Sequence, residues 1–70
     1  MAENVYKVVE LVVTSEESWE KAAAAAVTRA AASLRDLRIA EVKELDMQLD
    51  NGQVVTYRAK VAVSFKYEDG

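Results

Sequence analysis

The chain has seventy residues, about the size at which a single domain is only marginally stable alone. It contains neither cysteine nor histidine, which excludes disulfides and thiolate metal sites and removes the commonest general base. The net charge of -3 argues against a nucleic-acid-binding protein, which would usually carry a basic face.

Residues 4–13 predict a strand with two largely apolar faces. One face carries Val5, Lys7, Val9, Leu11 and Val13, and the other carries Tyr6, Val8, Glu10 and Val12. Strands that are apolar on both sides are usually buried on both sides. A single helix covers only one face of a small sheet, so we expect the second face to meet another subunit.

Residues 14–35 predict the one long helix. Thr14 with Glu17 fits a capping box, and Ser15 is a competing N-cap. A mostly alanine face follows at helical spacing, made by Trp19, Ala23, Ala26, Val27, Ala30, Leu34 and Leu37. Small side chains allow close approach to a sheet but bury little apolar area, so further burial is expected from an oligomer.

Residues 39–49 predict a second strand in which the apolar positions change phase. Ala40 and Val42 are apolar on one phase, whereas Leu45, Met47 and Leu49 are apolar on the other. A β-bulge near Lys43 or Glu44 would explain the change. The alternative is that the segment from Leu45 onward faces a different neighbour, and the sequence does not decide between them.

Asn51-Gly52 predicts a tight hairpin turn into a third strand over residues 54–67, where apolar and polar positions alternate regularly. The length of this strand favours a central position, with the strand order one, three, two. The predicted fold class is α+β in β-α-β-β order, with a three-stranded antiparallel sheet wrapped on one long helix.

Three segments together resemble the dodecin family. They are VYKVVELVVTSEESWEKAAAAAVTRAAASLRDL, IAEVKEL and TYRAKVAVSFK, which lie within residues 5–66. The resemblance implies a hollow homododecamer in which many members hold pairs of flavins between subunits, as storage or buffering proteins without catalytic turnover. The sequence agrees, because no nucleophile has a recognisable base at fixed spacing, and we expect no enzyme.

Four positions depart from the flavin-binding members. The resemblance implies that flavin-binding members have a tryptophan where this chain has Ile39, and that this tryptophan stacks on the flavin ring. Where this chain has Arg58, they have a glutamine that hydrogen-bonds the flavin edge. The resemblance also places arginine at Asp46 and glycine at Ser64 in bacterial members. Ile39 has no π-face and Arg58 no acceptor, so we expect flavin (FMN or riboflavin) to bind weakly or not at all.

The chain more closely resembles a subgroup that lacks this flavin-stacking tryptophan, the calcium dodecins. Glu41, Glu44 and Asp46, with Asp50 nearby, are the candidate metal ligands, since calcium takes six to eight oxygens. Asp46 is the preferred candidate, because the resemblance places a basic residue there in flavin-binding members. There is no EF-hand spacing, so a site would need several chains of a symmetric assembly or backbone oxygens. The alternatives are a solvated acidic strand, a flavin store with a remodelled pocket, and a purely structural cage.

The remaining expectations concern location and partners. Met1 to Asn4 is polar, and no apolar run approaches the roughly 20 residues that cross a bilayer. We therefore expect one cytoplasmic domain over residues 1–70, with other copies of itself and a small molecule or ion as partners, and with no nucleic acid or membrane.

Overall fold

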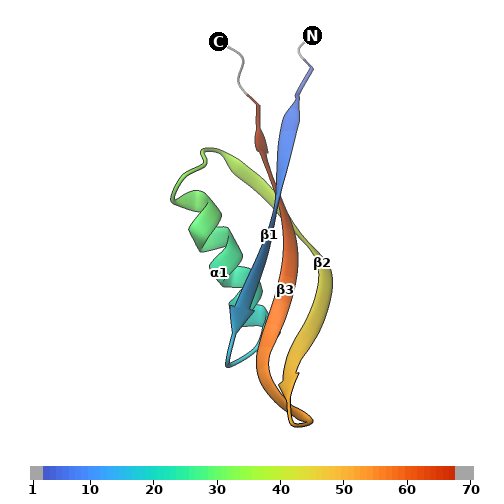
Figure 1. The fold of residues 1–70 in the computed structure, drawn as a ribbon. Coiled ribbons are helices and arrows are strands. Elements are labelled where there is room, and N and C mark those ends of the chain that lie inside the picture. The colour runs from blue at the N-terminus through green and yellow to red at the C-terminus, as the bar shows by residue number, and fades with distance from the viewer. Residues whose placement is uncertain (1–2, 68–70) are drawn as a thin grey trace.

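The computed structural model describes residues 3–67, as one helix packed on one face of a three-stranded sheet (Figure 1). The elements are β1 (Tyr6–Ser15), α1 (Trp19–Ala31), β2 (Leu37–Asp50) and β3 (Gln53–Lys66). The sheet has the order β1-β3-β2, and the central β3 is antiparallel to both neighbours. The predicted β-α-β-β topology is therefore confirmed, with α1 as the crossover between two outer strands.

The helix is shorter than predicted. It begins after Ser18, whose Oγ accepts a hydrogen bond of 3.1 Å from the backbone N–H three residues later. Thr14 and Ser15 are the last residues of β1 instead, paired with β3. The Oγ of Ser15 accepts from the Glu17 N–H at 3.0 Å in the connecting turn. The predicted cap was wrong because strand pairing extends β1 through two residues that could also have capped a helix.

The helix ends at Ala31 rather than Arg35, and five connecting residues precede β2. Asp36 lies in this connection with φ of 57°, a left-handed conformation that turns the chain toward the sheet. Its carbonyl accepts a hydrogen bond of 3.2 Å from the Lys66 N–H. Leu37, predicted on the helix face, belongs to β2. In the described part of the chain, no helix is long and apolar enough to cross a membrane.

The core is a contact between alanines and short aliphatic side chains. Its fully or nearly fully buried members are Ala22, Ala26 and Ala30 on α1 and Ala59, Val61 and Val63 on β3. The helical periodicity predicted Ala26 and Ala30 correctly but missed Ala22. Trp19, Ala23, Val27 and Leu34 flank the contact and are only partly buried. The helix therefore lies close to β3, as small side chains allow.

The three strands are each displaced by about two residues or fewer from the predicted ranges. β1 starts and ends two residues later than predicted, and β2 and β3 differ at their ends by one or two residues. The β2–β3 register shifts between Val42 and Glu44, which confirms a bulge at Lys43. Further shifts lie between Leu37 and Ile39 and between Gln48 and Leu49.

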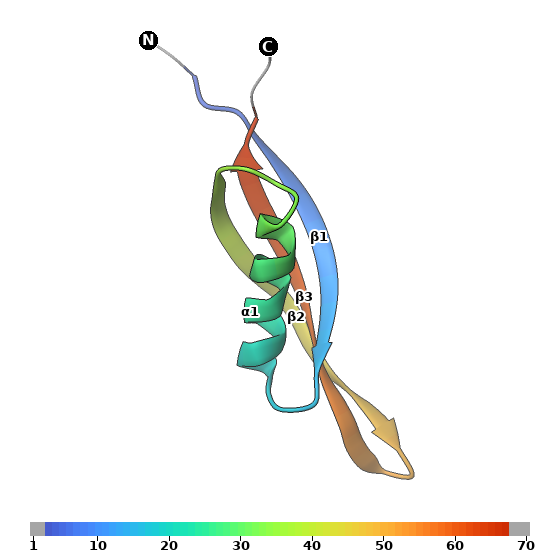
Figure 2. The same ribbon diagram turned by 90° about the vertical axis from the view of Figure 1, so that its left-hand side faces the viewer.

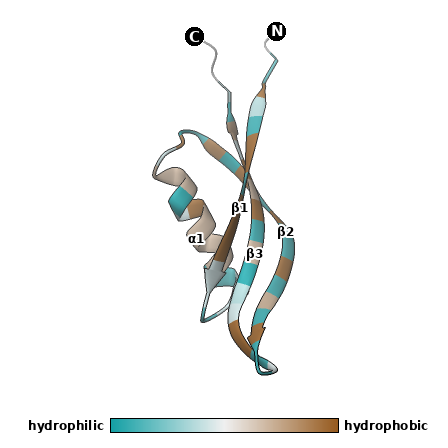
Figure 3. Cartoon of the chain, in the orientation of Figure 1, coloured by the Kyte–Doolittle hydropathy of each residue, from teal (hydrophilic) through white to brown (hydrophobic). Residues whose placement is uncertain are grey.

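The β2–β3 hairpin projects past the beginning of α1 (Figure 2). Asn51 and Gly52 form its turn with φ of 53° and 75°. Positive φ at both central residues is the geometry of a type I′ turn, for which Asn-Gly is the favoured pair. Apolar and polar residues alternate along β2 in the hydropathy colouring (Figure 3). The predicted hairpin is confirmed.

The core alanines predict a matched pair of helix substitutions. Ala26→Leu adds three carbon atoms where no accessible surface remains, so we expect a loss of about 1–3 kcal/mol in the free energy of unfolding. Ala24→Leu in the same helix is the control, because Ala24 is exposed and the propensity change is the same. Denaturant unfolding measures both variants. Equal stability of the two would contradict the close helix–sheet contact.

Candidate functional site on the helix-free face

The sheet surface opposite α1, here called the helix-free face, collects the candidate residues. Besides the Tyr6–Lys66 pair at one end, register places five cross-strand rows on it, in the order β1, β3, β2. The rows are Val8–Ser64–Ile39, Glu10–Ala62–Glu41, Val12–Lys60–Glu44, Thr14–Arg58–Asp46 and, without β1, Thr56–Gln48. All five predicted site residues thus lie on one face. The bulge at Lys43 is what joins them, since Ile39 and Glu41 are odd-numbered whereas Glu44 and Asp46 are even-numbered.

A two-bond ion pair dominates one end of this face. Arg58 Nε donates to Asp46 Oδ1 at 2.7 Å, and Arg58 Nη2 donates to Asp46 Oδ2 at 2.9 Å. Hydrogen bonding from Arg58 lowers the pKa of Asp46 from its usual value; partial desolvation opposes this shift, and the positive charge of Arg58 adds to it. Both side chains are about half exposed, so salt screens the pair.

A looser pair lies one row away. Lys60 Nζ is 3.8 Å from Glu44 Oε1, and Glu44 is mostly exposed. Within residues 3–67, no ion pair involves Glu41 or Glu10, which lie on either side of Ala62 in the adjacent row. Glu10 was missed as a candidate. The alternation of the first strand predicted which neighbours share a face with Glu10. Only the register shows that Glu10 and Glu41 lie in the same row, one on each side of Ala62.

The three predicted metal ligands do not converge within one chain. The partners of Glu41 and Asp46 on β3 are four residues apart, which corresponds to about 13 Å along a strand. Calcium binds oxygens at about 2.3–2.6 Å, so these two carboxylates cannot share an ion in one chain. Accordingly, no group of three acidic residues between residues 3 and 67 is arranged to hold a metal. A calcium site using all three would need other copies of the chain.

The two positions matched to a flavin pocket are also far apart. Ile39 pairs with Ser64 and Arg58 with Asp46, six residues apart on β3, or about 20 Å. One ring system cannot contact both residues of a single chain over that distance. Ile39 is two-thirds exposed, and its carbonyl accepts a 3.4 Å hydrogen bond from Ser64 Oγ. A pocket containing both residues would have to be completed by a second chain.

Trp19, on the helix side of the sheet, contacts β2 at Asp46, the residue whose side chain pairs with Arg58 on the helix-free face. Its indole Nε1 donates to the backbone carbonyl of Asp46 at 3.0 Å. Its ring meets Tyr57 edge to face, with centroids 5.2 Å apart and an interplanar angle of 71°. The start of α1 is thereby tied to the residue that also binds Arg58. Sequence reasoning assigned Trp19 to packing alone, because a hydrogen bond to a backbone carbonyl leaves no sequence signal.

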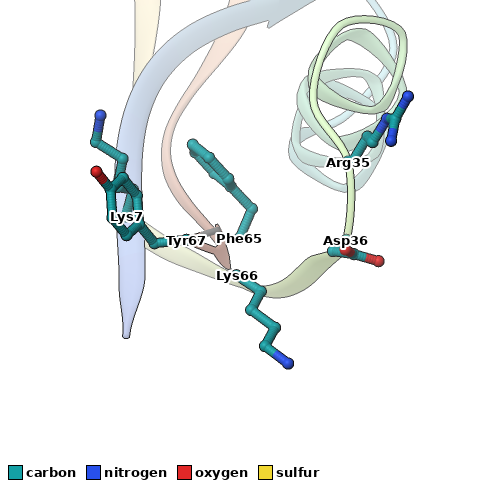
Figure 4. Close-up of a pocket in the computed structure, with 6 residues that line it drawn as sticks. All are labelled: Lys7, Arg35, Asp36, Phe65, Lys66 and Tyr67. Atoms are coloured by element: carbon teal, nitrogen blue, oxygen red, sulfur yellow. The ribbon is translucent and has the colours of Figure 1, made fainter. Parts of the chain in front are cut away.

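A basic hollow lies at the other end of the sheet. It has a volume of about 290 Å³ and is lined by Lys7, Arg35, Asp36, Phe65, Lys66 and Tyr67. Figure 4 shows the ends of Lys7, Arg35 and Lys66 pointing in different directions. The Lys7 ammonium lies 5.4 Å from the centre of the Tyr67 ring. The cationic groups do not converge on a common point, so this hollow has no prepared anion site.

The fold defines a small α+β protein with one open sheet face. The chain belongs to the dodecin family, because the family model described as Dodecin matches residues 5–68. It is 52% identical to the calcium dodecin of Mycobacterium tuberculosis over 63 residues, covering 90% of this chain and 89% of the relative. It is 45% identical to the dodecin of Thermus thermophilus over 65 residues, covering 93% and 94%.

A solved structure agrees with these sequence relatives. The crystal structure of the M. tuberculosis calcium dodecin, described as a calcium-chelating antigen with a novel calcium-binding site, superposes with a TM-score of 0.82. Its sequence identity is 50%, and the match covers 94% of each chain. The family and fold implied by the sequence resemblance are therefore confirmed.

The Asp46–Arg58 pair predicts a pH-dependent stability difference. The pKa of Asp46 is lowered in the folded chain, so its contribution is present above the unfolded pKa of about 4 and is lost as the pH falls through the folded value. We expect Asp46→Asn to lower the melting midpoint at neutral pH, and the difference from the wild-type chain to vanish at lower pH and to shrink in high salt.

Glu16→Gln is the control for this series, because Glu16 is exposed and belongs to no ion pair of the described residues. Melting curves of the three proteins across acid to neutral pH make the comparison. A difference between Asp46→Asn and wild type that persists below the lowered folded pKa of Asp46 would show that the ion pair is not its cause.

Proposed function

We propose that this chain is a non-enzymatic storage protein of the dodecin type, which assembles as a homododecamer and binds calcium. The observation that carries the proposal is the position of Glu41, Glu44 and Asp46 in consecutive rows of one exposed sheet face. Symmetry repeats every acid of that face, so an acid that lies near a symmetry axis of the proposed assembly would meet its own copies from other chains. The similarity to a calcium dodecin supports this choice of ion.

The ion pairs rank the three acids. Arg58 and Lys60 already neutralise Asp46 and Glu44, so a cation there must compete with a bound positive charge. Glu41 has no such competitor between residues 3 and 67, and its carboxylate is exposed. Glu41 is therefore the preferred calcium ligand of this proposal, with Glu44 and Asp46 as weaker or supporting ligands.

The second candidate function is flavin storage, and the same ion pair disfavours it. Arg58 is bound to Asp46 through two hydrogen bonds, which use two of its five N–H donors and fix the orientation of the guanidinium unless the pair opens. Ile39 supplies an aliphatic surface where a stacking ring would be needed. We expect FMN and riboflavin to bind this chain weakly or not at all.

The calcium proposal predicts a ligand-dependent melting midpoint. An ion that binds only the folded assembly stabilises it by about 2.7 kcal/mol per site at 100 times its dissociation constant, so we expect a rise of several degrees in calcium over chelator. Magnesium is the ion control. Glu41→Gln should reduce the rise most, and Glu16→Gln should leave it unchanged. Identical midpoints in calcium, magnesium and chelator would remove calcium from the proposal.

The flavin alternative predicts a gain of binding on substitution. Ile39→Trp with Arg58→Gln supplies a ring and an acceptor and releases Asp46, so we expect flavin fluorescence quenching at least tenfold stronger than for the wild-type chain. Ile39→Leu with Arg58→Lys is the matched control, since it restores neither group. Strong quenching by the unmodified protein would show that it binds flavin without these groups.

A further inference from the structure

Two cationic side chains stand next to each other on the central strand of the helix-free face. Arg58 and Lys60 are two residues apart on β3, so their side chains leave the same face about 7 Å apart. They are 46% and 40% exposed, so ions from solvent reach both. Thr14 pairs with Arg58 from the β1 side, and its hydroxyl is a further hydrogen-bond donor. The middle of the sheet thus presents two positive charges and a hydroxyl group to solvent.

The acids of β2 already fill the donors of these cations. Asp46 accepts two hydrogen bonds from Arg58, at 2.7 and 2.9 Å, and the Glu44 carboxylate lies 3.8 Å from the Lys60 ammonium. The planar fork of a guanidinium binds a carboxylate and a phosphate-like oxyanion through the same two parallel bonds. Asp46 is therefore bound as a tethered anion, and its high effective concentration excludes dilute free anions from Arg58.

We propose that Arg58 and Lys60 form an oxyanion site covered by the acids of β2, and that calcium bound by those acids uncovers it. The proposal rests on the calcium binding proposed above and adds a second, negatively charged ligand. A calcium ion that takes the Asp46 carboxylate withdraws it from Arg58 and places more positive charge beside the guanidinium. A tetrahedral inorganic oxyanion restores both the charge balance and the hydrogen bonds. Each ion then strengthens the binding of the other, because coupling between two sites is reciprocal.

The backbone beneath the ion pair is held, so the exchange of partners requires only side-chain motion. Asp46 pairs with Arg58 in the β2–β3 register, and the Asp46 carbonyl accepts a hydrogen bond of 3.0 Å from Trp19 Nε1. The carboxylate of Asp46 and the guanidinium of Arg58 are about half exposed, and exposed ion pairs contribute little to stability. The pair can therefore open without moving either strand and close again when the ions leave.

Asp46→Asn tests the anion site without calcium, because asparagine carries no charge and releases Arg58. We expect millimolar sulfate to raise the melting midpoint of Asp46→Asn above its value in sodium chloride of equal ionic strength, and to have no such effect on the wild-type chain. Equal ionic strength separates binding at a site from screening. Adding Arg58→Gln to this variant should remove the rise.

Arg38→Gln, added to Asp46→Asn in the same way, is the matched control. Arg38 lies outside the cross-strand rows and belongs to no ion pair between residues 3 and 67, so the rise in sulfate should remain. Equal midpoints of Asp46→Asn in sulfate and chloride would overturn the anion site, whether or not the wild-type chain binds calcium.

Calcium titration of the wild-type chain by calorimetry tests the coupling. We expect the calcium dissociation constant to be about fivefold or more lower in sulfate than in chloride of equal ionic strength, which is the lower end of typical coupling between sites. Arg58→Gln should abolish this difference. The same calcium affinity in both salts overturns the coupling alone. No calcium binding in either salt overturns the proposed calcium function and the coupling, whereas the Asp46→Asn series still decides the anion site.

Discussion

The close contact between three helix alanines and β3 is the constraint on which the remaining features depend. Ala22, Ala26 and Ala30 let the helix approach the sheet, but they cover only a narrow strip along Ala59, Val61 and Val63. Larger helix residues would cover more of the sheet and hold the helix farther away. The narrow contact leaves β2 and the hairpin tip open on the helix side. The small core and the large exposed apolar surface thus have the same cause, which is the use of alanine at the helix positions that contact β3.

The helix-free face is open because α1 packs on the opposite face of the sheet. Its surface is charged, whereas the open surface on the helix side is apolar. Basic residues of the central strand lie beside acidic residues of β2, so Arg58 and Lys60 partly neutralise Asp46 and Glu44. This arrangement stabilises a charged surface without burying it, because both pairs remain exposed to water. The same pairing restricts which acids are available to a ligand. Glu41 and Glu10 flank the small side chain of Ala62, and neither forms an ion pair with another residue between residues 3 and 67.

Much of the fold was predictable because its signals are local. The alternation in β3, the Asn51-Gly52 turn and the phase change around Lys43 each appear within a few residues. The first two were interpreted correctly, and for the third a bulge was one of two open alternatives, which the register confirms. The helix start was not interpreted correctly, because Thr14, Ser15 and Ser18 are all good caps and the choice depends on how far β1 pairs with β3.

The candidate site required information that one strand cannot provide. Asp46 and Arg58 were both singled out from the sequence, but their direct pairing depends on the register after a bulge. Convergence of the acids between chains depends on symmetry and stays a prediction.

The bulge at Lys43 links the two open surfaces. With regular alternation, the residues after Lys43 would keep the phase of Ile39 and Glu41, and Leu45 and Met47 would then lie on the helix-free face. Glu44 and Asp46 would lie on the helix side, beside the apolar groove that lies between the start of α1 and β2. The one extra residue reverses both placements, so β2 presents Leu45 to the groove and Asp46 to Arg58. The division of β2 into an apolar surface suited to self-contact and a charged surface suited to a ligand therefore depends on a single inserted position.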